Sequence, residues 1–156
     1  MRSRISAGLV MFRRRGGELE VFLAHPGGPF YVKKDDGCWT IPKGEVELGD
    51  DLLPTAIREF EEETGIVIDP GSAFIPLGSI QQKGGKIVHA WAVERDWDDT
   101  QPIRSNTFEC EWPPGSNRME CFPEVDRAQF FPLTAAKRKI KERQWELVER
   151  LVQQLE

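Results

Sequence analysis

Three glutamates fall at positions that a helix would bring onto one face. Glu59, Glu62 and Glu63 lie three and four residues apart, and residues at these spacings are neighbours on a helix surface. Glu61 lies two residues from Glu59 and is expected to point elsewhere. Like charges this close destabilise a helix, so the cluster needs a compensating cation. Mg²⁺, a hard ion that binds carboxylate and phosphate oxygens, meets this need, with Mn²⁺ as the alternative.

An acidic run is also typical of a solvated helix face, where clustered charges usually lie. The residues around this run favour chemistry instead. Arg58 adjoins the glutamates, a polar loop precedes the expected helix, and Gly65 follows it at a position where helices commonly end. We therefore interpret the glutamates as metal ligands.

The segment that presents the glutamates has the period of an amphipathic helix. Residues 52–64 are predicted to form this helix, with one stripe facing inward. The stripe consists of Leu53, Ile57, Phe60 and Thr64. Asp50 or Asp51 can cap its start. Pro54 is tolerated in the first turn, because its missing N–H has no helical partner there.

Short strands are expected on both sides of this helix. Strand patterns occur at residues 6–12, 18–24, 39–42, 74–81, 86–93 and 128–133. Residues 26–37 are expected to form a loop, and residues 96–123 an irregular stretch. This order predicts an α/β fold in a single domain, residues 1–156.

The C-terminal segment is expected to be helical. Thr134 is placed to cap a helix or helix pair that runs to the end of the chain. Its apolar face consists of Ile140, Leu147, Leu151 and Leu155. The basic residues between them, including Lys141, are expected on its wet face, and Arg13, Arg14 and Arg15 in a solvated turn.

The composition restricts the classes of function. The chain has 156 residues, a net charge of -5 and a pI of about 5.2, whereas nucleic-acid binders and membrane-surface helices are usually basic. No stretch approaches the ~20 apolar residues of a membrane helix. Three cysteines without metal-ligand spacing argue against zinc and predict a reducing, cytoplasmic location. The oligomeric state is left open.

The spacing around the glutamates resembles the Nudix hydrolase family. That family's pattern is Gly, five residues, Glu, seven residues, then Arg-Glu-apolar-any-Glu-Glu-any-Gly-apolar. Residues 44–66 match every fixed position except Asp50, which stands where Glu is usual. Residues 39–44 and the C-terminal helix extend the resemblance over most of the chain. The resemblance is to small bacterial-type members that cleave nucleoside triphosphates or diadenosine polyphosphates.

The resemblance implies an α/β/α sandwich around a mixed β-sheet, with a loop–helix–loop catalytic motif. It implies that Glu59, Glu62 and Glu63 bind the metal, that the backbone carbonyl of Lys43 adds a ligand, and that Arg58 orients the carboxylates. Gly44 would permit a sharp turn and Gly65 the helix exit. The shorter side chain of Asp50 puts the loop geometry, more than metal binding, in question.

The implied reaction is attack of a metal-activated water on phosphorus. The general base differs among branches of the family. Here it is Glu59 itself or an acid from a late loop, for which Glu124 is the first choice and Glu120 the second. An exposed loop acid without a catalytic role is the alternative for both.

Several residues are candidates for substrate binding. Lys43 and Lys86 are placed to contact phosphates. Trp39 and Trp91 are candidates for stacking on a base, although tryptophans in strands more often pack in the core. Trp97 and Trp112 are also candidates for binding, although local packing is the favoured alternative for both.

The predicted activity is hydrolysis of a nucleoside diphosphate linked to another group, X. Nucleoside triphosphates and dinucleoside polyphosphates are the leading substrates, and neither is singled out by a tyrosine or proline marker after the motif. A Nudix-fold module that binds a nucleotide without cutting it is the alternative from another class. A third reading is an interaction scaffold built on the terminal helix and Trp145.

Overall fold

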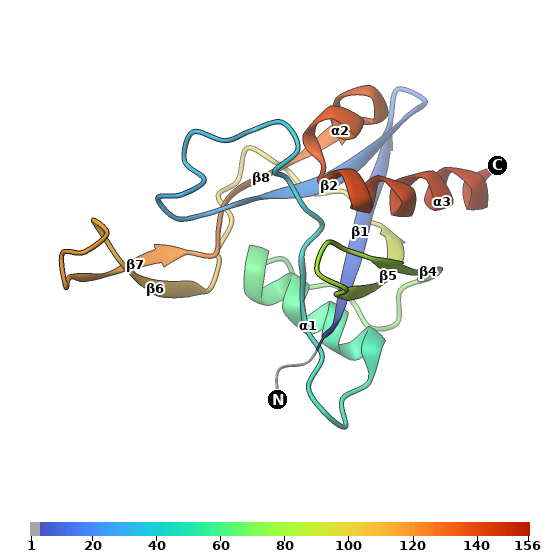
Figure 1. The fold of residues 1–156 in the computed structure, drawn as a ribbon. Coiled ribbons are helices and arrows are strands. Elements are labelled where there is room, and N and C mark those ends of the chain that lie inside the picture. Colours follow the sequence, from blue (N-terminus) through green and yellow to red (C-terminus); the bar gives the residue numbers. More distant parts are fainter. Residues whose placement is uncertain (1–3) are drawn as a thin grey trace.

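A mixed six-stranded sheet lies at the centre of the molecule (Figure 1). The computed structural model describes residues 4–156. The strands are β1 (Ile5–Arg15), β2 (Glu18–Pro26), β3 (Lys43–Glu45), β4 (Ile75–Gln81), β5 (Ile87–Glu94) and β8 (Val125–Pro132). They run in the order β4-β5-β1-β2-β8, with β3 paired to β1. β1 and β5 are parallel, and the other pairs are antiparallel.

Helices cover both faces of this sheet. α1 (Leu52–Thr64) lies on one face, and α2 (Leu133–Lys139), the 3₁₀ turn η1 (Glu142–Gln144) and α3 (Trp145–Leu155) lie on the other. Side chains alternate along a strand, so β1 contributes to two cores: Leu9 and Met11 pack beneath α1, and Val10 and Phe12 pack beneath α3. The expected α/β/α arrangement is confirmed.

α1 spans the residues predicted for it. Phe60 and Thr64 of the inward stripe are buried, and Leu53 and Ile57 pack at its edge. Asp51 holds the N-cap position, but its side chain makes no cap hydrogen bond; its carbonyl instead accepts from the hydroxyl of Thr55 at 2.7 Å. Gly65 ends the helix with φ +79°, the left-handed conformation expected of a C-terminal glycine.

Two predicted boundaries are wrong. The strand expected at residues 39–42 is reduced to isolated bridges at Trp39 and Thr40, and the true strand β3 follows it. Pro42 has no N–H to continue a ladder. Thr134 does not cap α2, because the helix starts one residue earlier with Pro132 at the N-cap, and Ile140 lies beyond its end.

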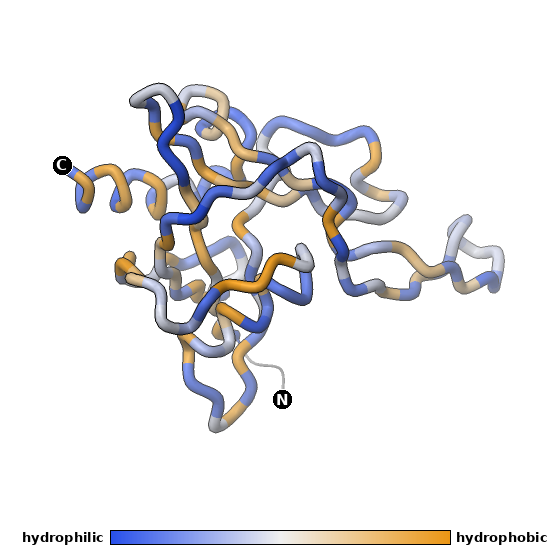
Figure 2. The backbone as a smooth tube through the Cα atoms, turned by 180° about the vertical axis from the view of Figure 1, so that it is seen from behind, coloured by the Kyte–Doolittle hydropathy of each residue, from blue (hydrophilic) through white to orange (hydrophobic). Residues whose placement is uncertain are grey.

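The stretch predicted to be irregular contains a β-hairpin. β6 (Thr107–Glu111) and β7 (Met119–Pro123) form a separate two-stranded sheet that projects from the body of the protein in Figure 1. Figure 2 shows only short hydrophobic stretches along it. Neither strand contributes to the two main cores. The alternation that marks a half-buried strand extends over only five residues in β6 and is irregular in β7.

Arg13 corrects the expectation of a solvated turn at residues 13–15. β1 continues through it, and Arg13 is 5% exposed. Its guanidinium contacts the carboxylates of Glu20 at 2.7 Å and Asp96 at 2.9 Å, and lies 4.0 Å from the centre of the Phe130 ring. Buried charges are tolerated when paired in this way.

The three cysteines are all free. None of the helices in the described part of the chain is long and apolar enough to cross a bilayer.

Candidate active site

The glutamates of α1 differ in exposure as the helical spacing predicts. The side chain of Glu59 is 19% exposed and that of Glu62 38%, whereas Glu61 is exposed. An oxygen of Glu63 accepts a hydrogen bond from the backbone N–H of Lys43 at 3.4 Å. The acidic face of α1 therefore meets β3, the strand that immediately precedes the helix-bearing loop.

Gly44 is required at this contact for a reason that differs from the one expected. It lies in β3 and is not among the glycines with positive φ, so it does not form the sharp turn predicted for it. A Cβ built at Gly44 would lie 2.1 Å from the carboxylate of Glu59. The missing side chain lets this carboxylate lie directly against the strand.

Arg58 joins the acids around it. Its guanidinium nitrogens lie 3.4 Å from Glu59, 3.7 Å from Glu62 and 3.8 Å from Asp50. Asp50, the departure from the family pattern, still reaches this arginine despite its shorter side chain. Arg58 is half-exposed, and its charge and hydrogen bond oppose the rise in the pKa of Glu59.

The surroundings of Glu59 and Glu63 disfavour the ionised form of both carboxyl groups. Burial raises the pKa of Glu63 to about 8, against the charge and amide of Lys43, and the charges of Glu124 and Glu59 raise it further. Burial, followed by the charge of Glu62, also raises the pKa of Glu59. Both carboxylates therefore resist ionisation until a positive charge arrives from outside.

Lysines gather around Lys43, whose backbone N–H contacts Glu63. Burial lowers the pKa of Lys43 to about 8, and the charges of Lys141 and Lys86 lower it further. Lys86 also lies 3.5 Å from Glu45. Lys43 and Lys86 were expected at the site. Lys141 was not, because it lies far along the chain in a basic run that has no mark of function.

Glu124 is held beside the glutamates by backbone hydrogen bonds. Its N–H donates to the carbonyl of Asn106 at 2.7 Å, and its carbonyl accepts from the N–H of Gly27 at 2.8 Å. The N–H of Asn106 in turn donates to the carbonyl of Glu62 at 2.8 Å. The charge of Glu124 is felt by both Glu59 and Glu63. Glu120, the second choice, is an exposed residue of β7.

Two tryptophans expected to stack on a base lie in packed positions. Trp39 is 2% exposed, its indole N–H donates to Asp35 at 2.7 Å, and its ring lies 4.9 Å from that of Phe131. The prediction of stacking is therefore wrong for Trp39, because the bridge to Ile140 draws it into the core. Trp91 is half-buried and packs against the core beneath α1.

The other two tryptophans have different surroundings. Trp97 packs edge-on against Phe22 with ring centroids 5.5 Å apart, so it belongs to the core beneath α1. Trp112 lies at the end of β6, edge-on to Phe30 at 5.5 Å, outside both cores.

The side-chain oxygens that α1 presents are of the type that binds a hard cation. They are carboxylate oxygens throughout, which is the ligand set of Mg²⁺. Within residues 4–156, no three acidic, histidine or cysteine side chains are drawn close enough together to hold an ion as they stand. Their carboxylates instead contact Gly44, Arg58 and the Lys43 amide, so binding would need side-chain rotation.

Comparison with known proteins places this arrangement in a family. The NUDIX domain model matches residues 2–151. The chain is 39% identical over 61 residues to a bis(5'-nucleosyl)-tetraphosphatase [asymmetrical] of Caenorhabditis elegans, in a match that covers 39% of this chain and 40% of that protein. It is 33% identical over 106 residues to the protein of the same name from Sus scrofa, covering 60% of this chain and 67% of that one.

A solved structure shares the fold. A crystal structure of a C. elegans Ap4A hydrolase binary complex superposes with a TM-score of 0.67 at 21% identity, over 96% of this chain and 97% of that one. The family model covers the central sheet, the glutamate-bearing helix and both helical layers, and on this ground the protein belongs to the NUDIX domain family.

Proposed function

We propose that this protein is a metal-dependent hydrolase that cuts a diphosphate bond in a nucleoside diphosphate linked to a group X. The observation that carries the proposal is the partly buried acidic face of α1, where the pKa of Glu63 is raised to about 8 next to Lys43. Such a site is stabilised by a cation and by an anionic substrate together. The relatives named above support a dinucleoside polyphosphate as the substrate. Nucleoside triphosphates are the second candidate class.

Each residue has a proposed role. Glu59, Glu62 and Glu63, with the carbonyl of Lys43, would hold Mg²⁺ or Mn²⁺, which when bound activates water and screens phosphate charge. Arg58 keeps the carboxylates of Glu59 and Glu62 directed at the site.

The proton and the phosphates are handled by other side chains. Glu124 accepts a proton from the attacking water, with Glu59 as the alternative base. The ammonium groups of Lys43, Lys86 and Lys141 bind the phosphate oxygens. The water oxygen bonds to phosphorus as the bridging P–O bond breaks, and the products are a nucleoside monophosphate and phospho-X. A single domain over residues 1–156 and a cytoplasmic location remain predictions that accompany this proposal.

The test is product analysis over a panel of substrates. The panel holds common and oxidised nucleoside triphosphates, ADP-ribose, diadenosine polyphosphates and nucleotide sugars, each with Mg²⁺ and with a chelator. Turnover of one class that needs both metal and Glu63 supports the proposal. If nothing turns over while a nucleotide raises the melting temperature, the hydrolase is contradicted and a binding module takes its place.

A further inference from the structure

Two segments far apart in the sequence meet outside the cores and expose aromatic rings. Residues 27–38 form the loop after β2, and residues 107–123 form the β6–β7 hairpin (Figure 1). Phe30 of the loop contacts Trp112 of the hairpin edge to face, at 5.5 Å between centroids and 84° between planes. Phe30 remains 56% exposed and its neighbour Tyr31 37% exposed. We call Phe30, Tyr31 and Trp112 the aromatic patch.

The hairpin that carries Trp112 begins and ends at the candidate active site. Asn106, just before β6, donates to the Glu62 carbonyl, and Glu124, just after β7, is the proposed base. Trp112 follows Asn106 by six residues, which at a rise of about 3.3 Å per residue allows up to roughly 20 Å between Trp112 and that root. The patch is therefore continuous with the site but well separated from the glutamates.

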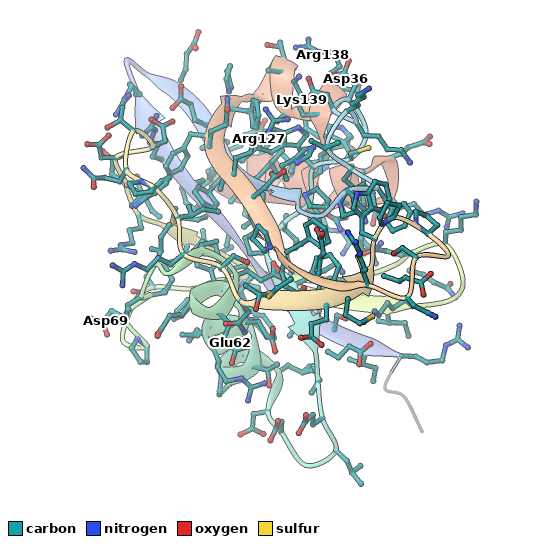
Figure 3. All side chains as sticks on the ribbon, turned by 90° about the vertical axis from the view of Figure 1, so that its left-hand side faces the viewer. Asp36, Glu62, Asp69, Arg127, Arg138 and Lys139 are labelled. Carbon is teal, nitrogen blue, oxygen red and sulfur yellow. The ribbon has the colours of Figure 1, made fainter. Side chains whose placement is uncertain are left out.

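The loop that carries Phe30 is fastened at both of its ends. At one end, Gly28 lies so close to Phe108 that a Cβ would be 2.7 Å from the ring, and Gly27 donates to the Glu124 carbonyl. At the other end, Lys139 of α2 contacts Asp35 at 2.5 Å and Asp36 at 3.1 Å, and Figure 3 shows Lys139 and Asp36 close together. These contacts fix the two ends of the loop on either side of Phe30.

The charges around the patch indicate which part of a ligand it receives. Glu109, Glu111 and Glu120 of the hairpin are exposed, and so is Arg118, whose carbonyl accepts from the Trp112 N–H at 2.9 Å, so acids outnumber basic residues on the hairpin. Lys34 is a cation beside the patch, 5.4 Å from the Tyr31 ring centre. An aromatic surface with acids around it suits a neutral, flat group such as a nucleobase, whose face stacks on aromatic rings.

We propose that the aromatic patch binds the second base of a substrate that carries a nucleoside at each end of its phosphate chain. The inference rests on the proposed function, because it assumes that the phosphates lie at Lys43 and the glutamates. The separation of patch and site favours a base at the far end of the chain over the base next to the cleaved bond. Phe30 and Trp112 are then specificity-determining residues for two-base substrates.

The test compares a two-base with a one-base substrate. In Trp112→Ala and Phe30→Ala, the KM for diadenosine tetraphosphate is expected to rise about tenfold or more, which is within the range for loss of one base–aromatic stack. The KM for ATP and the kcat for both substrates should change less than about twofold. Trp112→Phe, which keeps an aromatic face, should recover most of the loss. Met119→Ala, another exposed residue of the same hairpin, is the control and should match the wild type.

Binding without turnover separates this proposal from the one it rests on. In a Glu63→Gln background, calorimetry with diadenosine tetraphosphate should show the same weakening in Trp112→Ala. If the parent binds that ligand through Trp112 but the wild type never cleaves it, the patch is upheld and the hydrolase proposal fails. Equal effects on ATP and diadenosine tetraphosphate, no effect on either, or a Trp112→Phe variant as weak as Trp112→Ala would overturn the patch.

Discussion

Two sets of polar side chains, one in each helical layer of this protein, differ in how they are partnered. On the α1 side, Glu59 and Glu63 are drawn against β3, and burial raises the pKa of both. On the α2–α3 side, Gln144 is fully buried, and both its amide oxygen and its amide nitrogen are hydrogen-bonded. Its oxygen accepts from the N–H of Ile41 at 3.0 Å, and its nitrogen donates to Thr40 at 2.9 Å and to Gln82 at 3.2 Å.

The glutamates of the two layers sharpen the contrast. Glu146 and Glu149 of α3 are exposed, and Glu146 pairs with Arg150 one turn along the helix. Arg150 also donates to the carbonyls of Leu77 and Ser79 on the edge strand β4. The same residue type thus lies on a solvated surface of one helix and in the partly buried, proposed metal site of the other. The difference lies in burial and in pairing, because a buried charge without a partner costs free energy.

The largest expected effect is on activity when a buried acid of α1 is neutralised. Glu63→Gln should lower kcat for the best substrate at least about 100-fold, since the proposed metal loses a charged ligand. The matched change Glu149→Gln on α3 should leave the steady-state rate within about twofold. Comparable rates in the two variants would show that the layers do not differ in function.

The second effect concerns the pH dependence of stability without metal. Burial raises the pKa of Glu63 to about 8 in the folded protein, while an unfolded glutamate titrates near 4.3. The folded state therefore keeps a proton that the unfolded state releases in this interval, so the free energy of unfolding should fall as the pH rises from about 4.3 to about 8.

Denaturant titrations in the presence of a chelator measure this slope. Glu63→Gln cannot titrate at this position and should flatten the slope and be more stable than the wild type near pH 8. Each kcal/mol gained would raise the melting temperature by about 2–4 °C. If the Glu63→Gln protein is less stable than the wild type at that pH, burial of the Glu63 carboxylate is not unfavourable. The contrast with the bonded amide of Gln144 then fails.

The third effect has the opposite sign on the other layer. Gln144→Leu leaves the Ile41 N–H and the Gln82 amide without their partner and should lower the free energy of unfolding by about 1–3 kcal/mol. Gln154→Leu, at an exposed position of α3, is the control for adding a leucine. Chemical denaturation of both variants at one pH measures the two changes in the free energy of unfolding. An unchanged stability in Gln144→Leu would mean that the bonded amide contributes nothing.

The smallest effect is expected within α1 itself. Glu61 belongs to the same acidic run but is exposed, so Glu61→Gln should change kcat and KM less than about twofold. A large loss of activity with an intact circular dichroism spectrum would show that position on the helix face does not separate the active acids from the solvated one.

The parts of the molecule that were predicted correctly depend on local sequence. The bounds of α1 follow from its apolar period and from Gly65, both of which act within a turn of the helix. The grouping of Glu59, Glu62 and Glu63 follows from helical spacing alone. The layered α/β class follows from the order of the elements.

The parts that were missed depend on contacts between distant segments. Trp39 was a candidate for stacking, with packing in the core the more common outcome for a strand tryptophan, and its bridge to Ile140 lies in the core. Lys141 lacked any signal, because its place beside Lys43 is created by the fold of the C-terminal layer. The β6–β7 hairpin was read as irregular because its strands pack on neither main core.

The sequence by itself determined which residues could hold a metal, because the spacing of three acids on a helix is a local property. Only the tertiary structure decided that they are partly buried, with the pKa of Glu59 and Glu63 raised, rather than fully solvated. Gly44 admits the carboxylate of Glu59 against β3, and Asn106 and Gly27 bring Glu124 beside it. Burial and charge pairing arise when strands and helices from different parts of the chain come together, and these two quantities control the ionisation of a carboxyl group.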